Sequence, residues 1–263
     1  MPTSSDSDPD LKGPSGARSM VLPVPPRPAR VLAPVSLLFL LITWQVVIHG
    51  PLERADERLS AAMVHPGRIS TLLADLGNVE AAVPVLAVVL IGVAWRAREA
   101  GADRWWLPSA AAAVLMAAVP LLVALFKSLI ARPGPPGMGS VTGFYPSGHT
   151  ATAAIAYGGA ALVLWPWLGT PRARRTLIDL CVAVNLGVAY GLIRSGYHWP
   201  LDVLASWCLC APALFSLWIL LSRNGRRTPS AATASGSCCP AAPGSSPDPP
   251  HGAAVRDDAV GPV

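Results

Sequence analysis

Six long apolar segments, separated by polar connections, constrain the fold of this chain more than any other feature. Three of them contain no Asp, Glu, Lys or Arg: residues 31–52, 105–126 and 203–222. Each is long enough for a helix that crosses the hydrocarbon core of a bilayer, which takes roughly 20 residues. Residues 78–95, 149–168 and 177–193 are three further candidates. Because lipid offers no partner for backbone polar groups, we expect every segment to be a helix.

The composition excludes a soluble globular domain. Only 13% of the 263 residues are charged and 52% are hydrophobic, whereas a typical soluble domain carries about 25% charged residues. The predicted fold class is therefore all-α, a six-helix integral membrane bundle over residues 31–222. Residues 1–30 and 223–263 are rich in Pro, Ser, Ala and Gly, and we predict that both are disordered cytoplasmic tails.

The basic residues predict the orientation of the bundle. Thirteen of them fall in the connections that share one side if six helices alternate in direction. They are Lys12, Arg18, Arg27, Arg30, Arg96, Arg98, Arg104, Arg172, Arg174, Arg175, Arg223, Arg226 and Arg227. Positive charge marks the cytoplasmic side, so we expect a multi-pass protein of the plasma membrane with both termini in the cytoplasm. No basic stripe on one folded face supports a nucleic-acid partner.

The first connection on the opposite, outer side contains a short amphipathic stretch. Leu52, Ala55, Leu59 and Met63 recur at helical spacing within this part of the chain. We expect an interfacial helix here, lying against the membrane surface.

Three cations stand in the other two outer connections, at the ends of predicted helices. Lys127 and Arg132 follow the third helix, and Arg194 ends the fifth. None has an acidic partner in its own connection, so an anionic ligand is indicated, and arginine forks match phosphate oxygens. The alternative is that Lys127 or Arg132 merely extends from a helix end to the membrane surface.

A helix start in the same layer offers a second kind of phosphate ligand. Ser147 and Gly148 precede and open the fourth helix, where free backbone N–H groups and the helix dipole favour an anion. Glycine also lets a ligand approach the backbone closely. The alternative for Ser147 is a purely structural helix cap.

Two histidines and a carboxylate complete the candidate site. His149 is placed to give a proton to a leaving oxygen, and His198 can attack phosphorus directly, since histidine forms covalent intermediates. Asp202 lies four residues after His198, one helical turn away, where it can orient the imidazole and stabilise its cation. The alternatives are polar anchors at a membrane edge for the histidines and helix N-terminal stabilisation for Asp202.

These residues resemble the motifs of the type 2 phosphatidic acid phosphatase family, whose site is similar to that of the vanadium haloperoxidases. The family motifs read Lys, six residues, Arg-Pro; Pro-Ser-Gly-His; and Ser-Arg, five residues, His, three residues, Asp. The second motif matches in full from Pro146 to His149, the third at His198 and Asp202, and the first at Lys127.

The chain departs from the family at two arginines. The Arg-Pro of the first motif is Gly134-Pro135 here, with Arg132 two residues early. The Ser-Arg of the third is Gly191-Leu192, with Arg194 two residues late. Two residues turn a helix by about 200°, so Arg132 and Arg194 replace the motif arginines easily only if the local chain is not helical.

The resemblance covers roughly residues 31–222 and implies a lipid phosphatase that uses no metal and no cofactor. In this interpretation Lys127, Arg132, Ser147, Gly148 and Arg194 hold the phosphoryl oxygens, and His198, Asp202 and His149 act as nucleophile, orienting group and acid. The family implies undecaprenyl diphosphate, phosphatidic acid or phosphatidylglycerol phosphate as substrate, on the extracytoplasmic side. The alternative is a catalytically weakened lipid-phosphate binding or transport protein with the same fold.

Overall fold

A computed structural model describes residues 28–224, and their regular structure is helical. The helices are α1 (Pro28–Val47), α2 (Pro51–Met63), α3 (Arg68–Asp75), α4 (Val79–Glu99), α5 (Leu107–Ile130), α6 (Gly148–Leu164), α7 (Pro171–Arg194) and α8 (Pro200–Asn224), with a short 3₁₀ turn at Trp165–Trp167. The two predicted disordered tails, residues 1–30 and 223–263, lie outside the described residues, except that residues 28–30 and 223–224 are helical.

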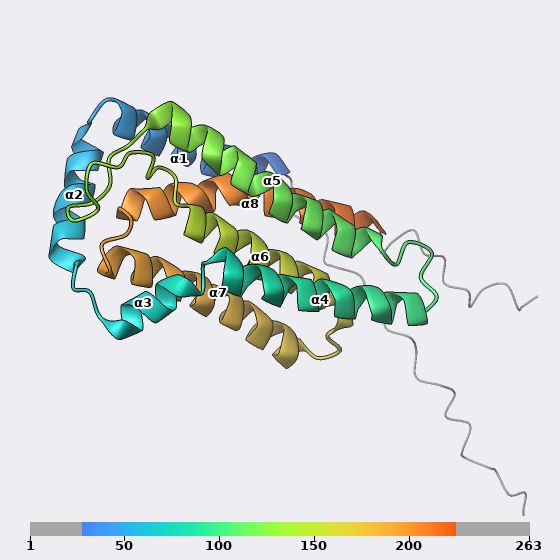
Figure 1. The fold of residues 1–263 in the computed structure, drawn as a ribbon. Helices are drawn as coiled ribbons and strands as arrows, with labels where there is room; N and C mark the ends of the chain where they lie inside the picture. Colours follow the sequence, from blue (N-terminus) through green and yellow to red (C-terminus); the bar gives the residue numbers. More distant parts are fainter. Residues whose placement is uncertain (1–27, 225–263) are drawn as a thin grey trace, which may run out of the picture. The chain divides into compact units, whose positions relative to one another are not determined.

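All six predicted segments form helices. Within residues 28–224, five of these helices, α1, α4, α5, α7 and α8, are long and apolar enough to cross a membrane. The sixth, α6, is shorter, with 17 residues. The predicted all-α membrane bundle is therefore confirmed, and Figure 1 shows its long helices running side by side.

Helix α6 forms the centre of the bundle. It packs against α4, α5, α7 and α8, and most of its residues are buried. The packed positions are small, including Ala151, Ala153, Ala156 and Gly159. Small side chains let helix backbones approach closely, which is how helices gain contact where lipid supplies no hydrophobic driving force.

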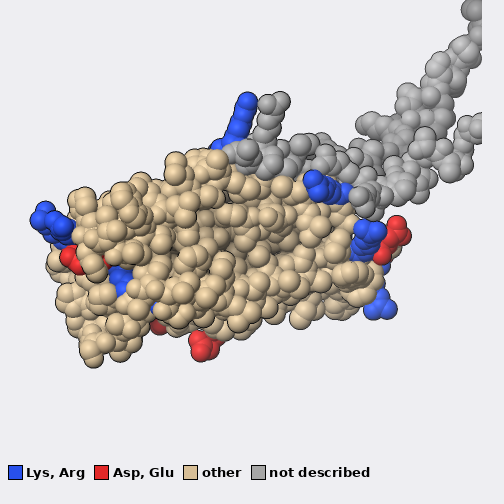
Figure 2. Space-filling view, turned by 90° about the horizontal axis from the view of Figure 1, so that it is seen from above, with Lys and Arg blue, Asp and Glu red and all other residues tan. Residues whose placement is uncertain are grey.

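Charged side chains gather toward the two ends of the bundle. On the face drawn in Figure 2, most blue and red side chains lie near the ends, and a wide uncharged surface separates them. Helices α2 and α3 and the loop after α5 lie together at one end, opposite the end at which α8 finishes (Figure 1). This is the end that the basic-residue pattern predicts to be extracytoplasmic.

The predicted amphipathic stretch forms α2, and its two faces have different partners. Leu52, Ala55 and Leu59 are exposed, as expected of an interfacial helix. The face turned into the protein is polar and carries buried Glu53 and Asp56. Helix α2 therefore contributes acidic groups to the interior, which the apolar periodicity did not predict.

Helix α3 packs tightly against α7 at a glycine. A Cβ atom at Gly191 would lie 2.5 Å from the backbone nitrogen of Ala74 and 2.5 Å from the carbonyl oxygen of Ser70. Both contacts are with the backbone of α3, which a rotamer change cannot relieve. The close approach of these two helices therefore requires glycine at position 191.

We predict that Gly191→Ala separates α3 from α7 and destabilises the detergent-solubilised protein by about 1–3 kcal/mol, the usual cost of overpacking. Thermal unfolding followed by tryptophan fluorescence measures this loss. Gly92→Ala in α4 is the matched control, because a Cβ there meets nothing within 4 Å. A Tm for Gly191→Ala equal to that of Gly92→Ala would contradict the packing argument.

Candidate active site

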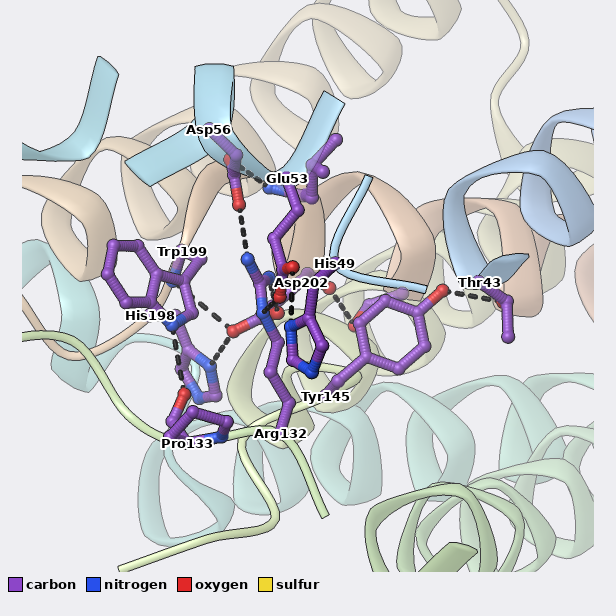
Figure 3. Close-up of polar contacts among 12 residues, drawn as sticks. Thr43, His49, Glu53, Asp56, Arg132, Pro133, Tyr145, His198, Trp199 and Asp202 are labelled. Carbon is purple, nitrogen blue, oxygen red and sulfur yellow. Dashed lines mark hydrogen bonds and ion pairs between the residues drawn. The ribbon is translucent and has the colours of Figure 1, made fainter. Parts of the chain in front are cut away.

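The site forms where five segments meet at the end of the bundle that carries α2. These are α2, the last turn of α5, the loop 131–147, the first turn of α6 and the start of α8. Figure 3 shows how side chains from α2, the loop and α8 point toward one another around Arg132 and Asp202. Residues far apart in sequence therefore share one polar centre.

His198 and Asp202 form a buried hydrogen-bonded pair. His198 Nδ1 lies 3.2 Å from Asp202 Oδ2, and the Trp199 N–H donates to the same oxygen at 3.2 Å. Asp202 stands in the first turn of α8, which begins at Pro200. Since a carboxylate accepts, the imidazole donates from Nδ1 and keeps its lone pair on Nε2. The predicted contact between these residues is confirmed, and it leaves His198 the tautomer that a nucleophile needs.

His149 faces His198 across a short gap. The two imidazole centroids are 6.4 Å apart, with ring planes at 63°. His149 lies in the first turn of α6. The Phe144 ring packs edge-on to the His198 ring, with 5.7 Å between the ring centroids. Two imidazoles at this separation can lie on either side of one phosphoryl group, which suits one as nucleophile and the other as proton donor.

Arg132 is buried and bound by three carboxylates. Its Nη1 lies 2.6 Å from Asp202 Oδ1, its Nη2 lies 2.9 Å from Asp56 Oδ2, and its Nε lies 3.4 Å from Glu53 Oε1. The guanidinium also lies over the Trp199 ring, 5.2 Å from its centroid. Phosphate binding by Arg132 stays a prediction; within residues 28–224 its ionic contacts are with carboxylates.

The ionisation of this cluster follows from burial and charge. Burial raises the pKa of Asp56 to about 6, although the hydrogen bond from Arg132 opposes the rise. Burial lowers the pKa of Arg132, but the carboxylates of Asp202 and Asp56 outweigh it and hold the pKa above its ordinary value. At neutral pH Asp56 is therefore mostly ionised and paired with a charged guanidinium.

Glu53 and Asp56 were missed by the sequence analysis. Their contacts with the site are made to Arg132 and Leu201, which lie 76 and 145 positions from Asp56 along the chain. One signal was present: two acids three residues apart, which share one face of the helix beside the face of Leu52, Ala55 and Leu59. In a chain with so little charge, that spacing indicates a polar face turned toward the protein.

Lys127 borders a groove that His149 also lines, while His198 is not among its lining residues. The groove has a volume of about 440 Å³ and lies between α4, α5 and α6. Its lining includes Lys127, Gly148 and His149 beside the apolar Val119, Pro120 and Val123. Lys127 is half-buried and forms no ion pair with another residue between positions 28 and 224. The structure thus brings together the predicted lysine, glycine and histidine.

Ser147 and Arg194, the other two predicted phosphate ligands, each contact another residue of the protein. Ser147 is the N-cap of α6: its Oγ accepts from the Thr150 N–H at 3.4 Å, and the residue is fully buried. The Arg194 guanidinium lies over the Tyr190 ring, 5.7 Å from its centroid, one turn back along α7. Arg194 is not among the residues that line the groove. Phosphate binding by Ser147 and Arg194 stays a prediction.

Packing explains why the motif arginines are absent from their usual positions. A Cβ at Gly134 would lie 2.6 Å from the Phe144 ring, the ring that packs on His198. Gly191 faces the α3 backbone, and Leu192 is fully buried in a cluster with Ala74, Ala153 and Val188. At both positions this chain places close packing where the family places a charged or polar side chain.

Comparisons with known proteins relate the chain to a family and to a solved fold. Residues 108–226 match the family model of the PAP2 superfamily, and no curated protein matches the chain. The crystal structure of a transmembrane PAP2-type phosphatidylglycerolphosphate phosphatase from Bacillus subtilis has the same fold. It is 22% identical, with a TM-score of 0.61 over 71% of this chain and 93% of that one. The family match confirms the predicted resemblance and the enzyme class that it carries, a phosphoric ester hydrolase.

We predict that Arg132→Met destabilises the protein severely, because it leaves Glu53, Asp56 and Asp202 buried without their cation. Breaking a buried ion pair from one side costs about 3–5 kcal/mol. Size-exclusion chromatography and thermal unfolding in detergent measure the loss. Arg58→Met, at an exposed position of α2, is the control and should unfold like the wild type. A normal Tm for Arg132→Met would show that the cluster is not needed for folding.

Proposed function

Taking residues 108–226 as a PAP2 superfamily segment, we propose that this membrane phosphatase hydrolyses a lipid phosphate or diphosphate through a phosphohistidine on His198. The observation that carries the proposal is the His198–Asp202 hydrogen bond of 3.2 Å, with the His149 ring 6.4 Å away. These groups supply a nucleophile, its orienting carboxylate and an acid around one space.

The phosphoryl group would be held by positive charge and backbone donors. Lys127 lines the groove beside the α6 N-terminus, where N–H groups without intrahelical partners favour an anion. Arg194 would join them by turning away from Tyr190, and Ser147 holds the helix start in place. Arg132 contributes through Asp202. Because phosphoryl transfer is mostly positioning and charge stabilisation, these groups would provide most of the rate enhancement.

The proposed reaction has two steps and needs no metal. The Nε2 lone pair of His198 attacks phosphorus, the bond from phosphorus to the leaving oxygen breaks, and His149 gives that oxygen its proton. In the second step His149 takes a proton from water, the hydroxide oxygen attacks phosphorus, and the P–N bond breaks. Asp202 stabilises the imidazolium character of His198 in both steps.

A lipid is the substrate that the groove favours. Its lining runs from Lys127 and His149 to the apolar Val119, Pro120 and Val123 of α5. A phosphate head can lie at the polar end while an acyl or prenyl chain follows the apolar side into the bilayer. Phosphatidic acid, phosphatidylglycerol phosphate and undecaprenyl diphosphate fit this description. We propose that the site faces the extracytoplasmic side of the plasma membrane, as the basic residues indicate.

We predict that purified protein in detergent releases phosphate from at least one of these lipids, and that release persists with excess chelator. His198→Ala should abolish it, because no nucleophile remains. Wild-type protein quenched in alkali, in which phosphohistidine is stable, should carry label from a radioactive substrate. Binding of the lipid without turnover would instead select a lipid-phosphate binding protein, and full dependence on added magnesium would contradict the metal-free steps.

The acid role of His149 predicts a dependence on the leaving group. His149→Ala should slow hydrolysis of an alkyl phosphate by about 10²- to 10⁴-fold, the usual contribution of a general acid. An aryl phosphate with an acidic leaving group needs no proton, so its hydrolysis should fall far less. Comparing kcat for the two substrates makes the measurement. Equal losses on both would assign His149 to phosphate binding instead.

A further inference from the structure

Helix α2 turns a charged face toward the active site. Glu53 and Asp56 are each only 4% exposed, while Glu57 on the same helix is exposed. Buried carboxylates are costly unless they are paired and hydrogen-bonded. An interfacial helix that only covered the bundle would bury apolar side chains here, so the acidic face calls for a specific explanation.

Asp56 makes two contacts, and both lead to the catalytic pair. Its Oδ2 lies 2.9 Å from Arg132 Nη2, and the same guanidinium lies 2.6 Å from Asp202 Oδ1. Its Oδ1 accepts the Leu201 N–H at 2.9 Å, a donor of the first turn of α8, next to Asp202. One carboxylate therefore fixes both the cation that binds Asp202 and the helix start that carries it (Figure 3).

Glu53 supports the same arrangement from one turn earlier. Its Oε1 lies 3.4 Å from Arg132 Nε, and its Oε2 lies 2.9 Å from His49 Nδ1. Together the two acids of α2 offset the charge of Arg132. Arg132 alone would neutralise Asp202 and weaken its hold on the imidazolium that forms at His198. With the α2 acids present, Asp202 keeps its negative character toward the histidine.

We propose that Asp56 is a positioning residue for catalysis, which sets the place and charge of Asp202 through Arg132 and the N-terminus of α8. This inference rests on the proposed function and extends it, since it assigns a role in the reaction to a helix outside the matched family segment. Asp56 touches neither histidine within the described contacts, so its effect passes through Arg132 and Asp202.

The test compares steady-state kinetics of Asp56→Asn and Glu57→Gln with the wild type, using the monodisperse fraction of each protein. Both variants remove one carboxylate from α2, but Glu57 is exposed and outside the cluster. We expect kcat of Asp56→Asn to fall by about 10²-fold, the scale for a misplaced catalytic group, with KM unchanged. Glu57→Gln should match the wild type, and Asp56→Glu should recover part of the lost kcat.

Competitive inhibition by inorganic phosphate gives a second measurement on the same samples. Inorganic phosphate should inhibit Asp56→Asn with the wild-type inhibition constant, because Asp56 does not contact Lys127 or the N-terminus of α6, which bind phosphate in the proposed mechanism. An unchanged kcat, or a loss that appears in KM and phosphate affinity instead, would overturn the inference. If Asp56→Asn does not stay monodisperse, Asp56→Glu decides: a reduced kcat at constant KM supports the role, and wild-type kcat rejects it.

The controls separate this inference from the function on which it depends. An active wild type with inactive His198→Ala and unaffected Asp56→Asn would reject the positioning role alone. A wild type that turns over none of the three lipids would reject the proposed function and the inference with it.

Discussion

Arg132 reaches from the loop after α5 into a space where carboxylates of α2 and α8 converge, and the outer end of the bundle is built around that contact. Separating those charges inside the protein would leave three carboxylates buried without a cation, which costs several kcal/mol. The loop, α2 and the start of α8 are therefore held to one arrangement. His198 and Asp202 are positioned by this arrangement. The same ion pairs therefore stabilise this end of the bundle and set the geometry of the site.

Close helix packing supplies the second constraint. The small residues of α6 let four neighbouring helices approach it, and its N-terminus is thereby placed beside Lys127 and the groove. Gly191 does the same for α3 on α7. At positions 134, 191 and 192, where the family motifs carry arginine or serine, this chain has Gly134, Gly191 and Leu192. These residues allow close packing and supply no charge to the site. Among the residues that line the groove, positive charge comes from Lys127 and the N-terminus of α6, and phosphate binding by Arg132 or Arg194 stays a prediction.

The arrangement also explains why charge is scarce elsewhere. A helix that crosses lipid tolerates few ionisable groups, and the described helices keep theirs mainly near the ends. At the end that carries α2, Arg132 is paired with three carboxylates and His198 with Asp202, whereas Lys127 forms no ion pair within residues 28–224. Asp56 belongs to this set although it lies on a helix that the apolar pattern assigns to the membrane surface. Helix α2 thus combines the exposed apolar face of an interfacial helix with the carboxylate that we propose positions Asp202.

The six apolar helices, the polar layer at one end of the bundle and the His198–Asp202 pair could be predicted from the sequence, because each is a local pattern: apolar length, a motif, and a four-residue spacing that matches one helical turn. It also placed His149 at a helix start. The partners of Arg132 were decided by tertiary structure, since Glu53 and Asp56 reach it only when α2 folds back over the loop and α8. The same holds for Gly191 and Leu192, whose identities reflect the backbone of α3 and a buried cluster. Contacts between distant segments depend on packing, and local patterns do not encode them.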